Sequence, residues 1–280
     1  MNLTIFPEND LPIGVFDSGM GGLTVLSQLK KKLPNEIFYY LGDTARVPYG
    51  TRSSETVIRY ARSCSQFLIK KGIKVLVIAC NTASSHALNT IKKEISIPVL
   101  GVVEPGAKAV IKKTKNKKIG IIGTEGTIES KSYNKIIKEI DPTIEVLSKA
   151  CPLFVPLVEE GWTEGIIPML IANEYLKPII DKGIDTLLLG CTHYPLLIPV
   201  IQNMTQKYSI EIVDSAEETA KEIVNLLQTC NLVRKDIKIY NEDMVKYFVT
   251  DAPEKFKKIG SRFLNETISN VEWIDILADS

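Results

Sequence analysis

Two segments of this chain, residues 71–80 and 182–191, repeat one pattern. Each has a glycine near its start, continues as an unbroken apolar run and stops at a cysteine, which is Cys80 in the first and Cys191 in the second. Such a glycine is typical of a helix end, and an unbroken apolar run is typical of a strand buried on both faces of a parallel sheet. Because ligands of open α/β sheets bind at the carboxyl ends of the strands, the repeat predicts a thiol at two such ends.

A second pair of similar segments, residues 13–18 and 119–124, supports a duplicated fold. Apolar runs and helical patterns alternate along the chain, which is typical of parallel βαβ units. We therefore expect an α/β fold of two pseudo-symmetric, doubly wound domains with mainly parallel sheets. If the halves face each other, the two thiols lie on opposite sides of one cleft.

The elements expected from these patterns are as follows. Strands are predicted at residues 13–16, 37–41, 75–79, 99–102, 119–123, 144–148, 186–190, 210–213, 247–250 and 271–276. Helices are predicted at residues 23–32, 53–71, 82–95, 128–140, 166–181, 216–227 and 253–264, the second of them capped by Ser53 or Ser54.

Composition and charge argue against several classes of protein. The 280 residues carry 34 Lys and Arg and 33 Asp and Glu, so the net charge of +1 gives no electrostatic reason to expect nucleic-acid binding. No apolar stretch approaches the length of a transmembrane helix, and the N-terminus lacks the pattern of a secretory signal. Five cysteines without a CxxC spacing favour free thiols in a reducing cytosol. We therefore expect a cytoplasmic protein that binds neither nucleic acid nor membrane.

Cys80 stands where a buried strand turns into a helix. A thiol at a helix N-terminus lies near the positive end of the macrodipole and near backbone N–H groups, so its thiolate form is favoured. Asn81 and Thr82 add polar groups where a ligand would lie. The alternative is an inert buried cysteine, which is the commonest fate of a single cysteine on an apolar strand. The matching cysteine in the second segment favours a functional thiol.

Cys191 is followed by Thr192 and His193. If the chain stays extended there, alternation points Cys191 and His193 the same way, so that the imidazole can exchange a proton with a thiol or with a substrate. Cysteine and histidine are also zinc ligands. However, structural zinc needs four ligands, usually in closely spaced pairs, and this segment supplies a single Cys-x-His. We expect no metal site.

A glycine-rich loop, residues 17–22, follows the first predicted strand. It fails the dinucleotide-binding pattern because Thr24 stands where the third glycine should be, and it lacks the lysine of a P-loop. Its glycines permit a close approach of the backbone to an anion such as a carboxylate. Asp17 at the strand end would repel that anion, so we expect it to orient an ammonium group or to hold a proton. The alternative is an aspartate that caps the following helix.

Four motifs together resemble a known family. In chain order they are Asp17-Ser18 with its glycine loop, Pro48-Tyr49-Gly50, Ala79-Cys80-Asn81-Thr82-Ala83 and Gly190-Cys191-Thr192-His193-Tyr194-Pro195. Each alone is a weak signal, but all four in this order, with the internal duplication, closely resemble the glutamate racemases of the cofactor-independent aspartate/glutamate racemase superfamily. The motifs span residues 17–195.

The resemblance implies a bacterial, cytoplasmic enzyme without a cofactor, a homodimer that interconverts L- and D-glutamate for peptidoglycan synthesis. It implies Cys80 and Cys191 as the two acid/base thiols. The residues that would line the glutamate site are Asp17, Ser18, Tyr49, Gly50, Asn81, Thr82, Thr192 and His193, with Asp17 and His193 also assisting proton transfer. The family has a further assisting glutamate, which the resemblance matches to Glu159 or its neighbour Glu160; we expect Glu159.

Elementary chemistry agrees with two thiols. Inverting an α-carbon requires a base on one face and an acid on the other, and a thiol whose pKa is tuned toward neutrality can serve as either. Hydrogen-bond donors from Ser18, Asn81, Thr82 and Thr192 would stabilise the carbanion-like transition state. No segment has the pattern of a pyridoxal lysine site.

With the resemblance, the first domain is expected to comprise residues 1–100 together with 210–280, and the second residues 101–209. Three other functions stay open. An aspartate racemase of the same superfamily would differ in pocket size. A related decarboxylase would keep one thiol, which the matched cysteines disfavour. A non-catalytic protein would only bind a small dicarboxylate.

Overall fold

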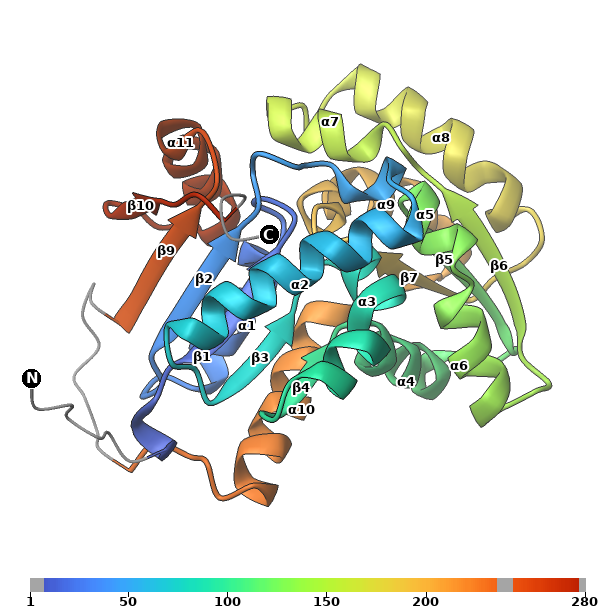
Figure 1. Cartoon of the computed structure of the whole chain (residues 1–280). Helices are drawn as coiled ribbons and strands as arrows, with labels where there is room; N and C mark the ends of the chain where they lie inside the picture. Colours follow the sequence, from blue (N-terminus) through green and yellow to red (C-terminus); the bar gives the residue numbers. More distant parts are fainter. Residues whose placement is uncertain (1–7, 236–243, 277–280) are drawn as a thin grey trace, which may run out of the picture.

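The chain folds into two parallel sheets with helices packed around them (Figure 1). The computed structural model describes residues 8–235 and 244–276. The strands of the first sheet lie in the order β10-β9-β2-β1-β3-β4, and those of the second in the order β6-β5-β7-β8. Every strand pairing in the two sheets is parallel. The predicted α/β class is confirmed.

The elements have the following bounds. The first sheet consists of β1 (Ile13–Asp17), β2 (Phe38–Gly42), β3 (Val75–Ile78), β4 (Val99–Gly101), β9 (Val245–Val249) and β10 (Val271–Trp273). The second consists of β5 (Lys118–Gly123), β6 (Glu145–Ala150), β7 (Thr186–Gly190) and β8 (Glu211–Asp214). The helices are α1 (Leu23–Lys32), α2 (Ser54–Lys70), α3 (Asn81–Glu94), α4 (Val103–Lys113), α5 (Glu125–Glu129), α6 (Ser132–Ile140), α7 (Phe154–Glu160), α8 (Ile166–Ile180), α9 (Ile198–Thr205), α10 (Ser215–Thr229) and α11 (Pro253–Leu264).

The two sheets repeat one strand order. The run β2-β1-β3-β4 of the first sheet corresponds to β6-β5-β7-β8 of the second, so the similar sequence segments fall on matching strands, β1 with β5 and β3 with β7. In each sheet the chain goes from the central strand to one side and then crosses to the other. Ligands bind in the crevice at the carboxyl ends of the two strands where the direction reverses. Those strands are β1 and β3 in one sheet and β5 and β7 in the other.

The return of the chain to the first sheet comes later than expected. The predicted boundary after residue 209 is too early, because β8 pairs with β7 in the second sheet. Only β9 and β10 return, β9 pairing with β2 and β10 with β9. Helix α10 packs against both α1 and α4, and so lies between the two halves. The division into two domains stays a proposal, with the second sheet ending at β8.

Most predicted helices form, and the exceptions have local causes. The helix expected at 128–140 is divided into α5 and α6, because Lys131 between them has a left-handed backbone with φ of 53°. Helices α4, α7 and α9 lie outside the predicted elements. In each of them a proline lies in the first turn, where its missing N–H breaks no intrahelical bond. The expected cap of α2 is Ser53, whose side chain accepts a hydrogen bond from Thr56 N.

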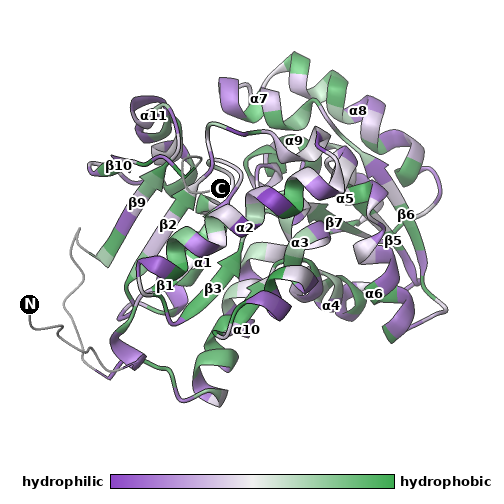
Figure 2. Cartoon of the chain, viewed as in Figure 1, coloured by the Kyte–Doolittle hydropathy of each residue, from purple (hydrophilic) through white to green (hydrophobic). Residues whose placement is uncertain are grey.

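Figure 2 shows hydrophobic residues along β3, and the hydrophobic residues of the central strands belong to buried clusters. Every residue of β1, β3 and β7 is buried, as the unbroken apolar runs predicted. None of the described helices is long and apolar enough to span a bilayer.

Candidate active site

The carboxyl ends of the central strands of both sheets meet at one small cavity. The residues that line it follow the carboxyl ends of β1, β3, β5 and β7, or belong to the loop after β2 and to α7. The lining residues are Ser18, Val47, Pro48, Tyr49, Gly50, Cys80, Asn81, Thr82, Thr124, Val155, Cys191, Thr192 and His193. Among the residues expected at the site, Asp17 and Glu159 do not line this cavity, and the others do.

The cavity is nearly closed. It holds about 20 Å³ of free volume, which is room for one water molecule. A larger hollow of about 310 Å³ adjoins it and shares Val47, Pro48, Gly50, Thr124 and Val155 as lining residues. This hollow forms the mouth of the site. A ligand larger than water can therefore enter from the mouth only when these walls move apart.

Cys80 is the N-cap residue of α3, and its surroundings are those expected of a thiol at a helix start. Its Sγ accepts a hydrogen bond from Ala83 N at 3.5 Å and donates to Ser18 Oγ at 3.6 Å. The expected lowering of its pKa is nevertheless wrong. Burial, reinforced by the nearby Asp17 carboxylate, raises the pKa of the Cys80 thiol to about 11 and outweighs its hydrogen bonds with Ala83 and Ser18.

Cys191 lies in a turn and not in an extended segment. His193 has φ of −80° and ψ of −29°, so the supposed strand alternation between Cys191 and His193 is wrong. The turn directs the His193 N–H to the Cys191 thiol, and both side chains line the cavity. Burial raises the pKa of the Cys191 thiol above its ordinary value, with the Cys80 and Asp17 charges acting in the same direction.

His193 is paired with the first of the two candidate glutamates. Its Nε2 lies 3.4 Å from Glu159 Oε1, whereas Glu160 is exposed. Burial acts to raise the pKa of the Glu159 carboxyl, but the hydrogen bond and charge of His193 more than offset it, so the pKa is lowered. Glu159 also lines the mouth of the site. The pair therefore connects the cavity wall at His193 with the entrance.

Asp17 is fully buried beneath the cavity. Its Oδ2 accepts a hydrogen bond from Gly19 N at 3.0 Å, and its Oδ1 accepts one from Thr192 Oγ1 at 3.4 Å. Burial raises the pKa of the Asp17 carboxyl, while the charge of His193 and these hydrogen bonds partly offset the effect. The aspartate thus joins the first glycine loop to the end of the second sheet.

Close contact between the halves requires a glycine at position 21. A Cβ atom there would lie 2.2 Å from Thr192 Oγ1 and 2.4 Å from His193 Nδ1, so any side chain would push the halves apart. The glycine loop therefore serves the packing of the two halves in addition to any contact with a ligand.

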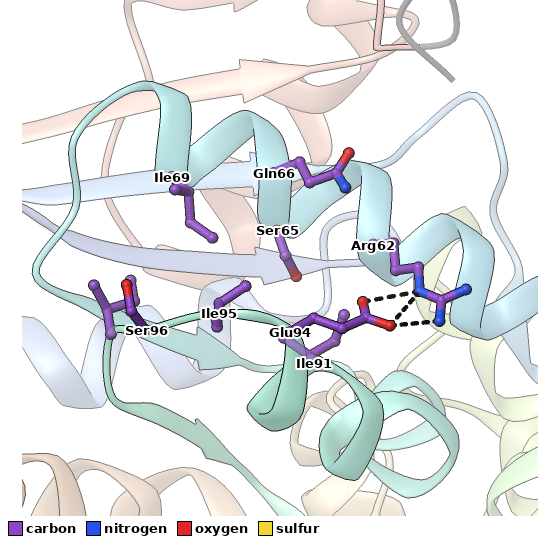
Figure 3. A pocket seen from close by; sticks show the side chains of 9 residues that line it. Arg62, Ser65, Gln66, Ile69, Ile91, Glu94, Ile95 and Ser96 are labelled. Carbon is purple, nitrogen blue, oxygen red and sulfur yellow. Dashed lines mark hydrogen bonds and ion pairs between the residues drawn. The ribbon is translucent and has the colours of Figure 1, made fainter.

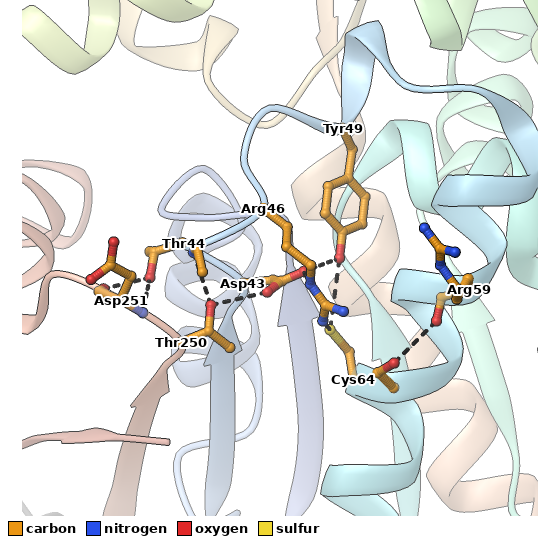
Figure 4. A network of polar contacts seen from close by, with 10 residues as sticks. Asp43, Thr44, Arg46, Tyr49, Arg59, Cys64, Thr250 and Asp251 are labelled. Carbon is orange, nitrogen blue, oxygen red and sulfur yellow. Dashed lines mark hydrogen bonds and ion pairs between the residues drawn. The ribbon is translucent and has the colours of Figure 1, made fainter. Parts of the chain in front are cut away.

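The Tyr49 hydroxyl is bound to groups outside the cavity, as Figure 4 shows. It donates to Asp43 Oδ2, and the same carboxylate accepts from Arg46 Nε at 2.6 Å and from Thr250 Oγ1 at 3.0 Å. Asp43 is fully buried and does not line the cavity. Tyr49 therefore presents its backbone and ring to the site, and its loop is fixed by a residue that follows β9.

Thr124 was not among the residues expected at the site. Its hydroxyl lies 2.9 Å from that of Thr82 and 3.0 Å from that of Thr127, so the three hydroxyls connect the two halves at the cavity. The internal repeat contained a signal for it, because Thr124 occupies the same position in residues 119–124 as Ser18 in residues 13–18. A second missed residue is Tyr133, whose hydroxyl accepts a hydrogen bond from Asn81 Nδ2 at 2.8 Å.

Another hollow lies away from the cysteines. It has a volume of about 290 Å³ and lies between α2 and the end of α3, lined by four isoleucines and five polar residues, among them the ion pair of Arg62 and Glu94 (Figure 3). It shares no lining residue with the cavity at the strand ends. Within residues 8–235 and 244–276, no three His, Cys, Asp or Glu side chains are grouped as a metal ion would require.

Comparisons with known proteins agree with this geometry. The model of the Asp/Glu/Hydantoin racemase family matches residues 18–223. The glutamate racemase of Geobacter metallireducens is 49% identical over 267 residues, which cover 95% of this chain and 97% of that protein. A crystal structure of a glutamate racemase isoform from Bacillus anthracis superposes with a TM-score of 0.90 at 40% identity, covering 95% of this chain and 98% of the other. The glutamate racemase of Francisella tularensis, solved with D-glutamate, gives a TM-score of 0.89 at 37% identity, with 96% and 99% covered.

Proposed function

The chain belongs to the Asp/Glu/hydantoin racemase family and is an amino-acid racemase, and we propose that it interconverts L- and D-glutamate by proton transfer between two cysteines. The observation that carries the proposal is the placement of Cys80 and Cys191 at one cavity, from matching strands of two duplicated sheets. Two thiols contributed by opposite walls can act on opposite faces of one α-carbon.

In the proposed reaction one cysteine, as thiolate, removes the α-proton, and the other, as thiol, delivers its proton to the opposite face. After the transfer the first cysteine is a thiol and the second is a thiolate, so the next turnover can run in the opposite direction. Because burial raises the pKa of both thiols, a thiolate must be stabilised when the substrate binds. The substrate ammonium supplies a nearby positive charge, which favours the thiolate form.

The polar residues of the cavity have proposed roles in this chemistry. Ser18, Thr82 and Thr192 offer hydroxyl donors, and Gly50 offers a backbone N–H, to the two carboxylates of glutamate. These donors stabilise the negative charge that spreads onto the α-carboxylate when the α-proton leaves. The closed cavity excludes water and strengthens each of these contacts. Asp17 and His193 assist proton exchange at the thiols, and Glu159 acts through His193.

The reaction as proposed needs no metal and no pyridoxal cofactor. Activity should then survive dialysis against EDTA and treatment with hydroxylamine, while thiol alkylation should abolish it and bound glutamate should protect. If chelation removed the activity and zinc restored it, the proposal would be contradicted.

The proposed biological role is the supply of D-glutamate for peptidoglycan synthesis in the cytoplasm.

We further propose that the enzyme is a homodimer. The proposal is supported by exposed apolar side chains at the start of α8, where Ile166 is 73% and Leu170 63% exposed. Trp162, which precedes this helix, is 53% exposed. A second copy can bury such a surface. Light scattering of the wild type and of Ile166→Glu should give a dimer and a monomer, respectively.

The decisive experiment is circular dichroism of the purified protein with L-Glu, D-Glu, L-Asp and D-Asp in turn. Decay of ellipticity for both glutamate enantiomers, and for neither aspartate, is the expected result. Racemisation of aspartate instead would identify the sibling activity. Binding of glutamate without exchange of its α-proton for deuterium would identify a non-catalytic dicarboxylate-binding protein.

A further inference from the structure

A single hydrogen bond joins a cavity residue of the first half to a buried tyrosine of the second. Asn81 follows Cys80 at the start of α3, and Tyr133 lies on α6. Asn81 Nδ2 donates to the Tyr133 hydroxyl at 2.8 Å, and both side chains are 2% exposed. Asn81 lines the cavity and Tyr133 does not. The tyrosine therefore contacts the site only through the amide.

The oxygen of the Asn81 amide has no hydrogen-bond partner among the described residues. This atom, Oδ1, is buried. A buried polar atom without a partner is costly, and its oxygen can only accept. At neutral pH the two carboxylates of glutamate only accept as well, so the ammonium is the one group of the substrate that can donate to this oxygen.

Tyr133 itself is held tightly. Its hydroxyl also hydrogen-bonds with the Ser215 side chain. A Cβ atom at Gly190 would lie 3.3 Å from its ring, and one at Gly106 would lie 3.3 Å from its hydroxyl. Because Gly190 directly precedes Cys191, the ring lies against the end of β7. The hydroxyl is thus fixed relative to the second thiol.

We propose that Tyr133 is a positioning residue, which turns the Asn81 amide so that Oδ1 faces the cavity and binds the substrate ammonium. With the amide reversed, Nδ2 would face the cavity instead and would bind a carboxylate. In the first orientation the Tyr133 hydroxyl accepts from Nδ2 and keeps its own proton available to Ser215, whereas in the reversed one it would have to donate that proton to Oδ1. The inference rests on the proposed function, because it takes a glutamate ammonium as the ligand.

The test compares two ligands that differ in the ammonium. Isothermal titration calorimetry measures the Kd of D-glutamate and of glutarate, which has both carboxylates and no ammonium. In Tyr133→Phe we expect the Kd of D-glutamate to rise about tenfold, the loss of one charge-assisted hydrogen bond, and that of glutarate to change less than about twofold. The matched control is Tyr194→Phe, which removes another buried hydroxyl, one that donates to Cys151 O at 2.9 Å outside the cavity. It should leave both Kd values within about twofold.

A second variant tests whether Tyr133 acts through the amide. Asn81→Leu keeps the approximate volume of the side chain and removes Oδ1, so it should reproduce the loss specific to D-glutamate. The double variant Tyr133→Phe/Asn81→Leu should bind no more weakly than Asn81→Leu alone. Additive losses would show that Tyr133 acts independently of Asn81 and would overturn the proposal.

The outcomes separate this inference from the proposed function. Equal losses for both ligands, or unchanged affinity for D-glutamate in Tyr133→Phe, overturn the inference while wild-type racemisation still stands. A wild type that neither binds nor racemises glutamate overturns the proposed function, and the inference with it. Thermal unfolding of each variant identifies any that does not fold. If Tyr133→Phe does not fold, an equal loss for both ligands in Asn81→Leu is enough to overturn the proposal.

Discussion

The surroundings of the two cysteines differ although the strands that carry them match. Cys80 caps a helix and has Ser18 and the enclosed Asp17 carboxylate as its neighbours. Cys191 lies in a turn, next to an imidazole that is paired with Glu159 at the mouth of the site. The duplication supplied two thiols at equivalent strand ends. The polar groups beside the two thiols differ between the halves.

In the proposed mechanism, this difference gives the two faces of the cavity different routes for proton exchange. On the Cys80 side the nearby carboxylate is fully buried, so a proton held there has no direct contact with solvent. On the Cys191 side a chain of two titratable groups leads from the cavity wall to the mouth. Four experiments test the difference between the two cysteines.

The largest effect is expected from removing either thiol. In Cys80→Ala or Cys191→Ala one face has no acid or base, so racemisation should fall by about 10³-fold or more in both directions. Circular dichroism from each pure enantiomer measures the loss. Cys230→Ala, which changes an exposed cysteine after α10, is the matched control and should keep the wild-type rate. Full activity in either Ala variant of the cavity cysteines would refute the two-thiol mechanism.

Alkylation compares the two thiols directly. Only the thiolate reacts, so a raised pKa lowers the rate at neutral pH and makes it climb about tenfold per pH unit below that pKa. Mass spectrometry can follow the carbamidomethylation of Cys80 in the Cys191→Ala variant. The rate of this modification should rise about 100-fold from pH 7 to pH 9, because the pKa of the Cys80 thiol is raised to about 11. An alkylation rate that no longer rises above neutral pH would contradict a pKa set mainly by burial. In Cys80→Ala, the alkylation rate of Cys191 should likewise keep rising with pH over this range, because burial raises its pKa.

Removing the neighbouring groups should separate the two directions of the reaction. Asp17→Asn and His193→Asn each impair one thiol more than the other, so we expect kcat to fall about tenfold in one direction and less in the reverse, in opposite senses for the two variants. Because the equilibrium constant between enantiomers is one, kcat/KM must fall equally in both directions. The asymmetry therefore appears only when kcat and KM are measured separately from pure L- and pure D-glutamate. Equal kcat losses in both directions for both variants would leave these residues as general binding groups.

The smallest effect is expected at the mouth. Glu159→Gln removes the charge that pairs with His193, at a site that is partly exposed, so we expect a loss of about fivefold, equivalent to about 1 kcal/mol, in the direction that depends on His193. Glu160→Gln is the adjacent control and should keep the wild-type kcat in both directions. A larger effect from Glu160 would contradict the geometry of the pair.

The sequence predicted those parts of the molecule that depend on local patterns. Unbroken apolar runs gave β3 and β7, and the cysteines that end them line one cavity. The serine cap of α2 and the alternation of strands and helices are equally local. Helices α4, α7 and α9 were not among the predicted elements, and each has a proline in its first turn.

The remaining features depend on residues far apart in the chain. The raised pKa of Cys80 follows from burial by both halves, which no motif around residue 80 contains. Tyr49 directs its hydroxyl out of the cavity because Asp43 is held by Thr250, about two hundred positions later. The contact of Asn81 with Tyr133 crosses from one half to the other. Thr124 is the instructive exception, since comparison of the two sequence repeats would have identified it.

During synthesis, β9 leaves the ribosome after most of the chain has emerged, although its place is beside β2, near the N-terminus. Until then β2 has an open backbone edge, and unpaired edges are sites of aggregation in nascent chains. Asp43, just after β2, also lacks its Thr250 partner until then, so one of the hydrogen bonds that hold the loop of Tyr49 is missing. A nascent chain that stalls before residue 245 therefore holds both cysteines while the edge of its first sheet is still open.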